Sequence, residues 1–320
     1  SISLNMAGEK IIALSGGVGG AKLCLGLHQI CEPEDLYFIT NTGDDFLYLG
    51  FYISPDVDTL VYTLAGVNNA ETGWGRSDET WKTHNVLGEL GADNWFKLGD
   101  KDLALHLHRS KALRNGECLT SITQDIANRF HIKATVLPMS DHMIQTVIDT
   151  DKGLLSFQEY FVKEASKPKI KGISFKSKNP EPSTEVTETL MDPDLKSIVI
   201  CPSNPYLSID PILSIEKIRQ SIAESKKPRV AVSPIINGQS IKGPTSKIMQ
   251  ELGLEVNVLT IAQHYKDCID GIVIDTSDQD YAGQIESMGI HVKLSKIMMN
   301  NDDDKKRVAE DVINFIDHIS

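Results

Sequence analysis

The sequence predicts an α/β fold, with a mostly parallel sheet and helices on both of its faces. The first observation is "KIIALSGG" at 10–17, an apolar run that ends in glycines and is followed by apolar residues at helical spacing. The second is the return of this order at 36–67, where "LYFITNTGDD" precedes the helical pattern of "DVDTLVYTLAGV". Strand, turn, helix and strand in succession are typical of a parallel, Rossmann-like sheet.

The same alternation returns in the last third of the chain. The segments "SIVICPSN", "RVAVSPIING" and "DGIVIDTSD" each indicate a buried strand that runs into a loop. A helix is expected to start with Asp210 as its cap and Pro211 at its first position, and another to end at Gly253. We therefore expect a Rossmann-like core formed by residues 8–100 and 132–320.

The middle of the chain is more helical. A helix is expected from a cap at Ser77 to Gly91, and residues 101–131 are expected to form a small helical insertion. Strands are expected in "KATVLPMS" and "MIQTVIDT". Residues 164–194 are rich in Lys, Pro, Ser and Glu, which predicts an exposed hairpin or a mobile excursion.

Composition narrows the class of protein. The chain has 320 residues, of which 41% are hydrophobic and 24% charged, as in ordinary globular proteins. Its net charge of −12 argues against a nucleic-acid partner. Its apolar runs are too short for a membrane helix, and the first ten residues lack the apolar core of a signal peptide. Five scattered cysteines without metal-ligand spacing predict a reduced, cytoplasmic protein.

A glycine-rich loop after the first strand is the leading candidate for a phosphate site. It departs from both standard phosphate-binding templates, because Ala21 and Leu23 break the Walker pattern and Lys22 replaces the third glycine of the dinucleotide pattern. Glycines without Cβ atoms let backbone N–H groups approach an anion at a helix start. A tight turn without a ligand is the alternative, with the lysine pointing away. The candidate nucleotide-binding residues here are Gly16, Gly17, Val18, Gly19, Gly20 and Lys22.

Four aspartates follow the second strand, at Asp44, Asp45, Asp56 and Asp58. Converging carboxylates suit Mg²⁺, and one of them could instead accept a proton from an attacking hydroxyl. The last two could simply cap the next helix. We select Asp45 and Asp56 as metal ligands or catalytic groups, with the choice between these roles left open.

Two further loops follow predicted strands and carry small polar groups. In "CPSNPYLSIDPIL", two prolines stiffen the loop that holds Ser203 and Asn204, and asparagine suits a nucleobase or ribose. In "SPIINGQSIKGPTSK", a helix start again follows glycine and lysine. A structural turn and a solvated loop are the alternatives. The candidate residues of this second loop are Pro234, Gly238, Lys242 and Gly243.

Mixed charges stand before another expected helix, in "FKLGDKDLALHLHRS". Asp100 or Asp102 is expected as the helix cap. His106 and His108 are two residues apart, so they point to different helix faces and are excluded from the site.

Six separated motifs stand in one order between about Ile11 and Asp275: "SGGVGGAKL", "NTGDD", "SPDVDT", "GDKD", "PSNPYLSIDPIL" and "SPIINGQSIKGP". In this order they resemble the 2-phospho-L-lactate transferase family of coenzyme F-420 biosynthesis. The resemblance implies transfer of 2-phospho-L-lactate from lactyl-2-diphospho-5′-guanosine to the deazaflavin FO, giving F-420-0 and GMP with Mg²⁺. It also implies that residues 16–20 face the donor diphosphate and that Ser203, Asn204 and residues 234–243 hold the guanosine end.

The acceptor half follows from the same resemblance. Asp45, Asp56 and Asp58, with Lys97 nearby, would bind FO or Mg²⁺ around the acceptor hydroxyl. Trp74, Trp81, Trp95 and residues 46–51 are candidates to stack on the deazaflavin ring, with core packing as the alternative for each. A homodimer is expected, with the helical insertion as its contact.

Three alternatives stay open. The donor could be the phosphoenolpyruvyl analogue, which gives a dehydro product. A non-catalytic nucleotide sensor on the same scaffold would keep the glycine and Asn204 loops without needing the acidic cluster. A nicotinamide dehydrogenase is disfavoured, because the third glycine is missing and the second strand ends without an acidic residue.

Overall fold

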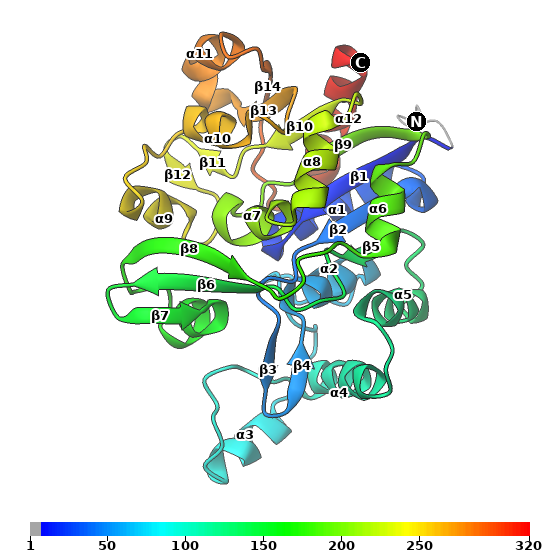
Figure 1. Cartoon of the computed structure of the whole chain (residues 1–320), viewed down its shortest axis with the longest axis vertical. Coiled ribbons are helices and arrows are strands. Elements are labelled where there is room, and N and C mark those ends of the chain that lie inside the picture. Colours follow the sequence, from blue (N-terminus) through cyan, green and yellow to red (C-terminus); the bar gives the residue numbers. More distant parts are fainter. Residues whose placement is uncertain (1–7) are drawn as a thin grey trace.

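A seven-stranded parallel sheet forms the centre of the computed structural model, which describes residues 8–320 (Figure 1). Its strand order is β14-β13-β10-β9-β1-β2-β5, so the prediction of a parallel α/β fold is confirmed. Most of the segment assessed for a signal peptide lies outside the described residues. The strands are β1 (Lys10–Ser15), β2 (Leu36–Thr40), β5 (Thr135–Pro138), β9 (Leu195–Ile200), β10 (Arg229–Val232), β13 (Gly271–Asp275) and β14 (His291–Ser295).

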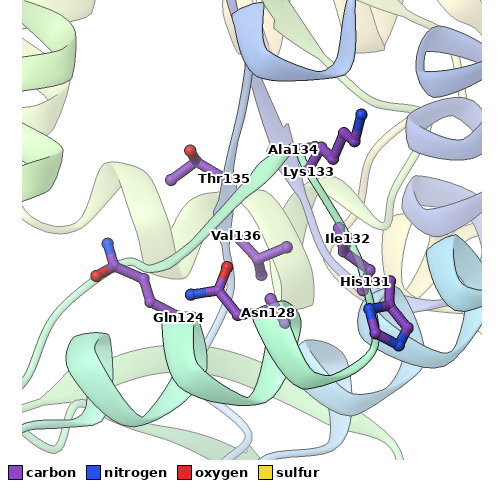
Figure 2. Close-up of a pocket in the computed structure, with 9 residues that line it drawn as sticks. Gln124, Asn128, His131, Ile132, Lys133, Ala134, Thr135 and Val136 are labelled. Atoms are coloured by element: carbon purple, nitrogen blue, oxygen red, sulfur yellow. The ribbon is translucent and has the colours of Figure 1, made fainter.

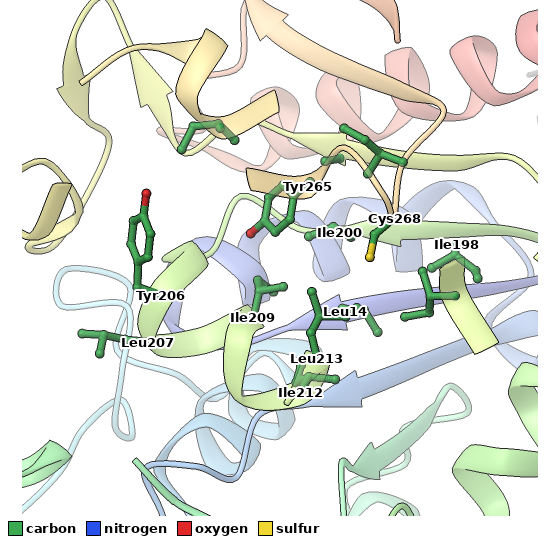
Figure 3. Close-up of a cluster of buried hydrophobic side chains, with 14 of the residues drawn as sticks. Leu14, Ile198, Ile200, Tyr206, Leu207, Ile209, Ile212, Leu213, Tyr265 and Cys268 are labelled. Carbon is green, nitrogen blue, oxygen red and sulfur yellow. The ribbon is translucent and has the colours of Figure 1, made fainter. Parts of the chain in front are cut away.

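Helices cover both faces of this sheet because its strands are apolar on both sides. Ile11 and Ala13 of β1 face the layer that contains α1 (Gly17–Ile30), α2 (Pro55–Ala65) and α12 (Asp302–Ile319). Ile12 and Leu14 face the opposite layer. That layer contains α6 (Thr184–Leu190), α7 (Asp210–Leu213), α8 (Glu216–Glu224), α10 (Val258–Tyr265) and α11 (Ala282–Glu286). Figure 3 shows Leu14 in one buried cluster with Ile209 and Leu213.

The end of β9 differs locally from the expectation. A π-helical turn, η3 (Pro205–Ile209), precedes α7, and Ile209 rather than Asp210 is the cap of that helix. The Asp210 carboxylate instead meets His264 Nε2 at 2.7 Å. Asp210 therefore joins α7 to α10.

Four helices separate β4 from β5. After α2 come α3 (Lys82–Glu89), α4 (Asp100–Arg114) and α5 (Leu119–Arg129). Before them stands the hairpin of β3 (Phe46–Tyr48) and β4 (Phe51–Ile53), which points away from the main sheet (Figure 1). The helix expected from Ser77 starts only at Lys82. Gly73, Gly75 and Asp78 have positive φ, so this segment is a loop, closed by a bridge between Asn68 and Arg76.

A second, antiparallel sheet has the order β7-β6-β8. It is built from β6 (Gln145–Thr150), β7 (Gly153–Ser156) and β8 (Ile170–Lys176). Residues 164–194 thus contain β8 and α6. A small hairpin of β11 (Ile235–Ile236) and β12 (Gln239–Ser240) leads into α9 (Thr245–Glu251). Among residues 8–320, every helix is too short or too polar to span a bilayer.

Candidate functional site

A cavity of about 570 Å³ lies at the carboxyl ends of the central strands. Its walls come from the start of α1, the start of α2, residues 95–97, the loop after β9 and the loop after β10. This is the edge at which open α/β sheets bind ligands, and the volume is that of a typical ligand pocket. The expected site residues found on its walls are Gly16, Gly17, Val18, Gly19, Asp56, Asp58, Lys97, Ser203, Asn204, Pro234, Lys242 and Gly243.

The start of α1 presents backbone N–H groups to this cavity. Gly16 is the helix cap, and Gly17 has a φ of +65°, which favours glycine. A Cβ on Gly19 would lie 2.7 Å from the Pro202 carbonyl oxygen, and one on Gly20 would lie 2.5 Å from Ser203 Oγ. Glycine at positions 19 and 20 thus lets the loop after β9 pack closely against α1. The expected reason for these glycines was different, namely access of an anion to the backbone N–H groups.

Four of the expected residues lie outside the cavity wall. Lys22 turns away, and its Nζ donates to the carbonyl oxygen of Met299 at 3.0 Å. Burial lowers its pKa, and the charge of Lys242 lowers it further. Gly20 is enclosed by protein, and Gly238 forms the turn between β11 and β12. The fourth residue is Asp45.

Asp45 lies behind the wall, where hydroxyl groups satisfy it. Tyr52 donates to Oδ2 at 2.8 Å, and Ser54 Oγ lies 2.9 Å from both carboxylate oxygens. Asp44, the preceding residue, lines the cavity instead. The structure therefore brings Asp44, and not the expected Asp45, to the wall beside Asp56.

Asp44 and Asp56 form a buried carboxyl pair on this wall. Burial raises the pKa of Asp44 well above its ordinary value, and the charges of Asp56 and Asp45 raise it further. Burial also raises the pKa of Asp56, against the opposing effect of hydrogen bonds from Asn41 and from Asp44. Asp44 Oδ1 is buried without a hydrogen-bond partner. The pair is therefore suited to take up either a proton or a cation.

A second charged cluster lies deeper in the same cavity and joins α2 to α4. Arg109 pairs with Asp58, and both are buried. His106 Nε2 lies 3.3 Å from Asp102 Oδ2, and His106 Nδ1 lies 3.7 Å from Asp58 Oδ2. Tyr62 donates to Asp102 at 2.6 Å.

His106, which the sequence pattern excluded from the site, lies on the cavity wall. Asp58, Asp102 and His106 all line the cavity, and their ligand atoms lie within 4.8 Å of one another. The spacing of His106 from His108 was the wrong comparison. The informative spacing is from Asp102 to His106, four residues along one helix face. Asp58 and Arg109 come from different helices, and no sequence spacing connects them.

The two clusters differ in how well they suit a cation. Asp58 already has a full positive partner in Arg109, so the deeper cluster needs less charge compensation. Asp44 and Asp56 have no ion-pair partner among the described residues, and one carboxylate oxygen is unpartnered. Hard oxygen ligands of this kind fit Mg²⁺ better than a set that includes imidazole. The carboxyl pair is thus the better fit to the implied Mg²⁺.

An aromatic wall closes one side of the cavity. Trp95, Phe96, Phe157 and Phe161 line it, and the last two stack with ring centroids 5.4 Å apart. Trp74 also lines the cavity and is 46% exposed, so it is available to a ligand. Trp81 does not reach the wall, and its ring instead lies 5.5 Å from Lys97 Nζ.

The loop after β9 supplies polar groups beside the start of α1. Ser203 Oγ accepts a hydrogen bond from the Gly16 N–H at 3.2 Å. Asn204 Oδ1 accepts from the N–H groups of Tyr206 and Leu207, whereas Asn204 Nδ2 is a buried donor without a partner. Lys242 also lines the cavity, and its Nζ donates to the Thr72 carbonyl oxygen at 2.9 Å. An unused amide donor and a lysine thus remain available for an oxygen-rich ligand.

A smaller hollow of about 440 Å³ lies between α5 and β5 (Figure 2). Gln124, Asn128 and Thr135 line it, with His131 and Lys133 at its rim. None of the expected site residues reaches it. The expected site residues that line a cavity therefore all line the larger one.

The fold and the cavity together define an α/β protein with a ligand site at the carboxyl edge of a parallel sheet. Comparison with known proteins gives the family. Residues 11–314 match the model of the family described as 2-phospho-L-lactate transferase CofD. The chain therefore belongs to the 2-phospho-L-lactate transferases of coenzyme F-420 biosynthesis, which transfer a phosphorus-containing group.

Individual relatives cover nearly the whole chain. A 2-phospho-L-lactate transferase of Methanocaldococcus jannaschii is 37% identical over 95% of this chain and 97% of its own length. A phosphoenolpyruvate transferase of Streptomyces griseus is 34% identical over 97% of this chain and 99% of its own. A solved UPF0052 family protein from Bacillus halodurans shares the fold, with a TM-score of 0.60 and 16% identity over 98% of this chain and 99% of that one.

Proposed function

We propose that this chain transfers the 2-phospho-L-lactate group from lactyl-2-diphospho-5′-guanosine to FO, giving F-420-0 and GMP. The observation that carries the proposal is the composition of a single cavity. The start of α1 and the Asn204 loop supply donors on one wall, and the Asp44–Asp56 pair and an aromatic wall stand beside them. A diphosphate, an alcohol and a planar ring need these three surfaces close together.

In the proposed mechanism, the N–H groups at the start of α1 bind the donor diphosphate, and Asn204 Nδ2 binds the guanosine end. The terminal ribityl oxygen of FO attacks the phosphorus that carries the lactyl group. The bond from this phosphorus to the GMP oxygen breaks, and GMP leaves. Asp56 accepts the hydroxyl proton; Asp45 remains the alternative acceptor, although it lies behind the wall.

Asp44 and Asp56 would hold Mg²⁺, with Asp45 behind them. When bound, Mg²⁺ supplies positive charge for the phosphate oxygens. The chain's own residues align the reactants and exclude water, which is most of what phosphoryl transfer requires. Trp95, Phe96 and Phe157 would hold the deazaflavin ring, with Lys97 at its edge.

The phosphoenolpyruvyl donor is the second candidate, because relatives named phosphoenolpyruvate transferase are about as similar as those named for phospholactate. Purified protein, FO and MgCl₂ should be incubated with each donor, and F-420-0, its dehydro form and GMP measured by mass spectrometry. Asp56→Asn should abolish turnover while guanine-nucleotide binding survives; Asp303→Asn, on an exposed face of α12, is the matched control. Nucleotide binding without product from either donor would instead support the non-catalytic sensor.

We also propose a cytoplasmic homodimer. All five cysteines are free thiols, as in a reducing compartment. Val86 of α3, Leu90 directly after it and Leu47 of the neighbouring hairpin are 50%, 77% and 68% exposed. This part of the molecule, and not the insertion at 101–131, is therefore the candidate contact. Light scattering after gel filtration tests the dimer, and Leu90→Glu should shift it to monomer if α3 is the contact.

A further inference from the structure

An acidic side chain stands at the helix start that is proposed to receive phosphate. A Cβ on Gly16, the cap of α1, would lie 2.8 Å from Asp56 Oδ2, and the Gly17 N–H faces the same carboxylate. Asn41 Nδ2 donates to Asp56 Oδ2 at 2.9 Å and is itself fully buried, so Asp56 is held in this place. The positive end of α1 therefore already has an anion beside it.

This charge has no ion-pair partner among residues 8–320. Asp44 adds a second carboxyl group, which is 3% exposed and lines the cavity, with Oδ1 unpartnered. Asp58, two residues along α2, differs because Arg109 pairs with it. Oxygens of a diphosphate that enter beside Asp44 and Asp56 meet like charge in a buried place, where screening by water is weak.

We propose that Asp56 makes the binding of a nucleoside diphosphate conditional on a divalent cation. Without the cation, Asp56 occupies the N-terminal end of α1 and repels phosphate. With the cation, the carboxyl pair is compensated and the diphosphate reaches the free N–H groups of Val18 and Gly19. This inference rests on the proposed function for its choice of guanosine diphosphate as the ligand, and it concerns the binding step, before any chemistry.

The test is the affinity for guanosine diphosphate, measured by calorimetry with MgCl₂ and with EDTA. The wild-type affinity should fall by roughly tenfold or more in EDTA, since a buried like-charge contact is left uncompensated. Asp56→Asn keeps the shape and the contact with Asn41 but removes the charge. Its affinity in EDTA should lie within about threefold of the wild-type value in MgCl₂. Equal cation dependence in the two proteins would overturn the proposal.

Two further variants keep the test decisive. Asp44→Asn should reduce the cation dependence in the same direction, and it replaces Asp56→Asn if that variant fails to fold by circular dichroism. Asp303→Asn changes net charge equally at an exposed position and should keep the full wild-type dependence. If Asp303→Asn also lost the dependence, net charge and not Asp56 would be the cause, and the proposal would be wrong.

Inorganic pyrophosphate separates this inference from the proposed function. It carries the same phosphate chemistry without guanosine. Its binding should therefore show the same dependence on the cation, and Asp56→Asn should remove that dependence. If pyrophosphate behaves in this way and guanosine diphosphate does not bind, the guanosine part of the proposed function fails and the role of Asp56 stands. If pyrophosphate binds equally with and without cation, the role of Asp56 fails while the transferase assay remains an independent test.

Discussion

Arg109 on α4 pairs with Asp58 on α2 through both terminal nitrogens; Arg109 is fully buried, and Asp58 is buried apart from the edge that lines the cavity. The pair joins the segment that carries the acidic residues to the helix that carries His106. Removing one member of a buried ion pair destabilises the fold, because the charge of the other member is then buried without compensation.

Replacement of this arginine should therefore be costly. Arg109→Met is expected to lower the free energy of unfolding by about 3–5 kcal/mol, since it leaves the Asp58 carboxylate buried without its arginine partner. Urea denaturation measures this, and adding Asp58→Asn should restore part of the loss. Arg129→Met removes the exposed pair with Asp125 and should cost less than about 1 kcal/mol. Equal losses in the two single variants would contradict this account.

The close packing of Gly19 can be tested separately. Gly19→Ala places a methyl group against the Pro202 carbonyl, which cannot move without shifting the loop of Ser203 and Asn204. A loss of about 1–3 kcal/mol is expected from such overpacking. Gly283→Ala is the control, because a Cβ at that position would meet no other atom within 4 Å. Thermal unfolding measures the stability of both variants. A Gly19→Ala protein as stable as the wild type would show that the loop moves aside at no cost and would contradict the prediction.

The aromatic wall should affect the acceptor more than the donor. Trp95→Leu removes ring area from the cavity and is expected to raise the KM for FO by about threefold to tenfold, the usual worth of an aromatic contact. Phe130→Leu removes an aromatic ring from outside the cavity and should leave that KM unchanged. Steady-state kinetics with the donor saturating measures both. A KM change for the donor alone would place FO elsewhere.

Arg229 and Asp270 predict a pH dependence of stability. Burial raises the pKa of Asp270, but hydrogen bonds from Arg229 outweigh this effect and hold the pKa below its ordinary value. A lowered pKa stabilises the fold above the unfolded value of about 4, and this stabilisation is lost as pH falls through the folded pKa.

Asp270→Asn should thus cost about 1 kcal/mol at pH 7, discounted because Asp270 is 41% exposed. The difference from wild type should shrink below pH 4. Urea unfolding between pH 3 and 7 measures it, and a constant difference would exclude ionisation as its cause.

The sequence allowed most of the sheet and its layers to be predicted, because runs such as "KIIALS" are apolar on both faces and can only be buried. It could not separate Asp44 from Asp45, which are adjacent and point to different partners. His106 was missed since its second neighbour, Asp58, lies on another helix. The helix start at Ser77 failed because Asp78 adopts a positive φ that no residue pattern announces.

The strand order has a consequence for synthesis of the chain on the ribosome. β1 lies between β2 and β9, and β9 begins only at Leu195. Until more than half of the polypeptide has emerged, one edge of β1 has no neighbour to pair with, and an open apolar strand invites association with other chains. The nascent protein is therefore expected to depend on chaperone protection for a long interval, and its ligands cannot shorten that interval because residues 203–245 complete the walls that hold them.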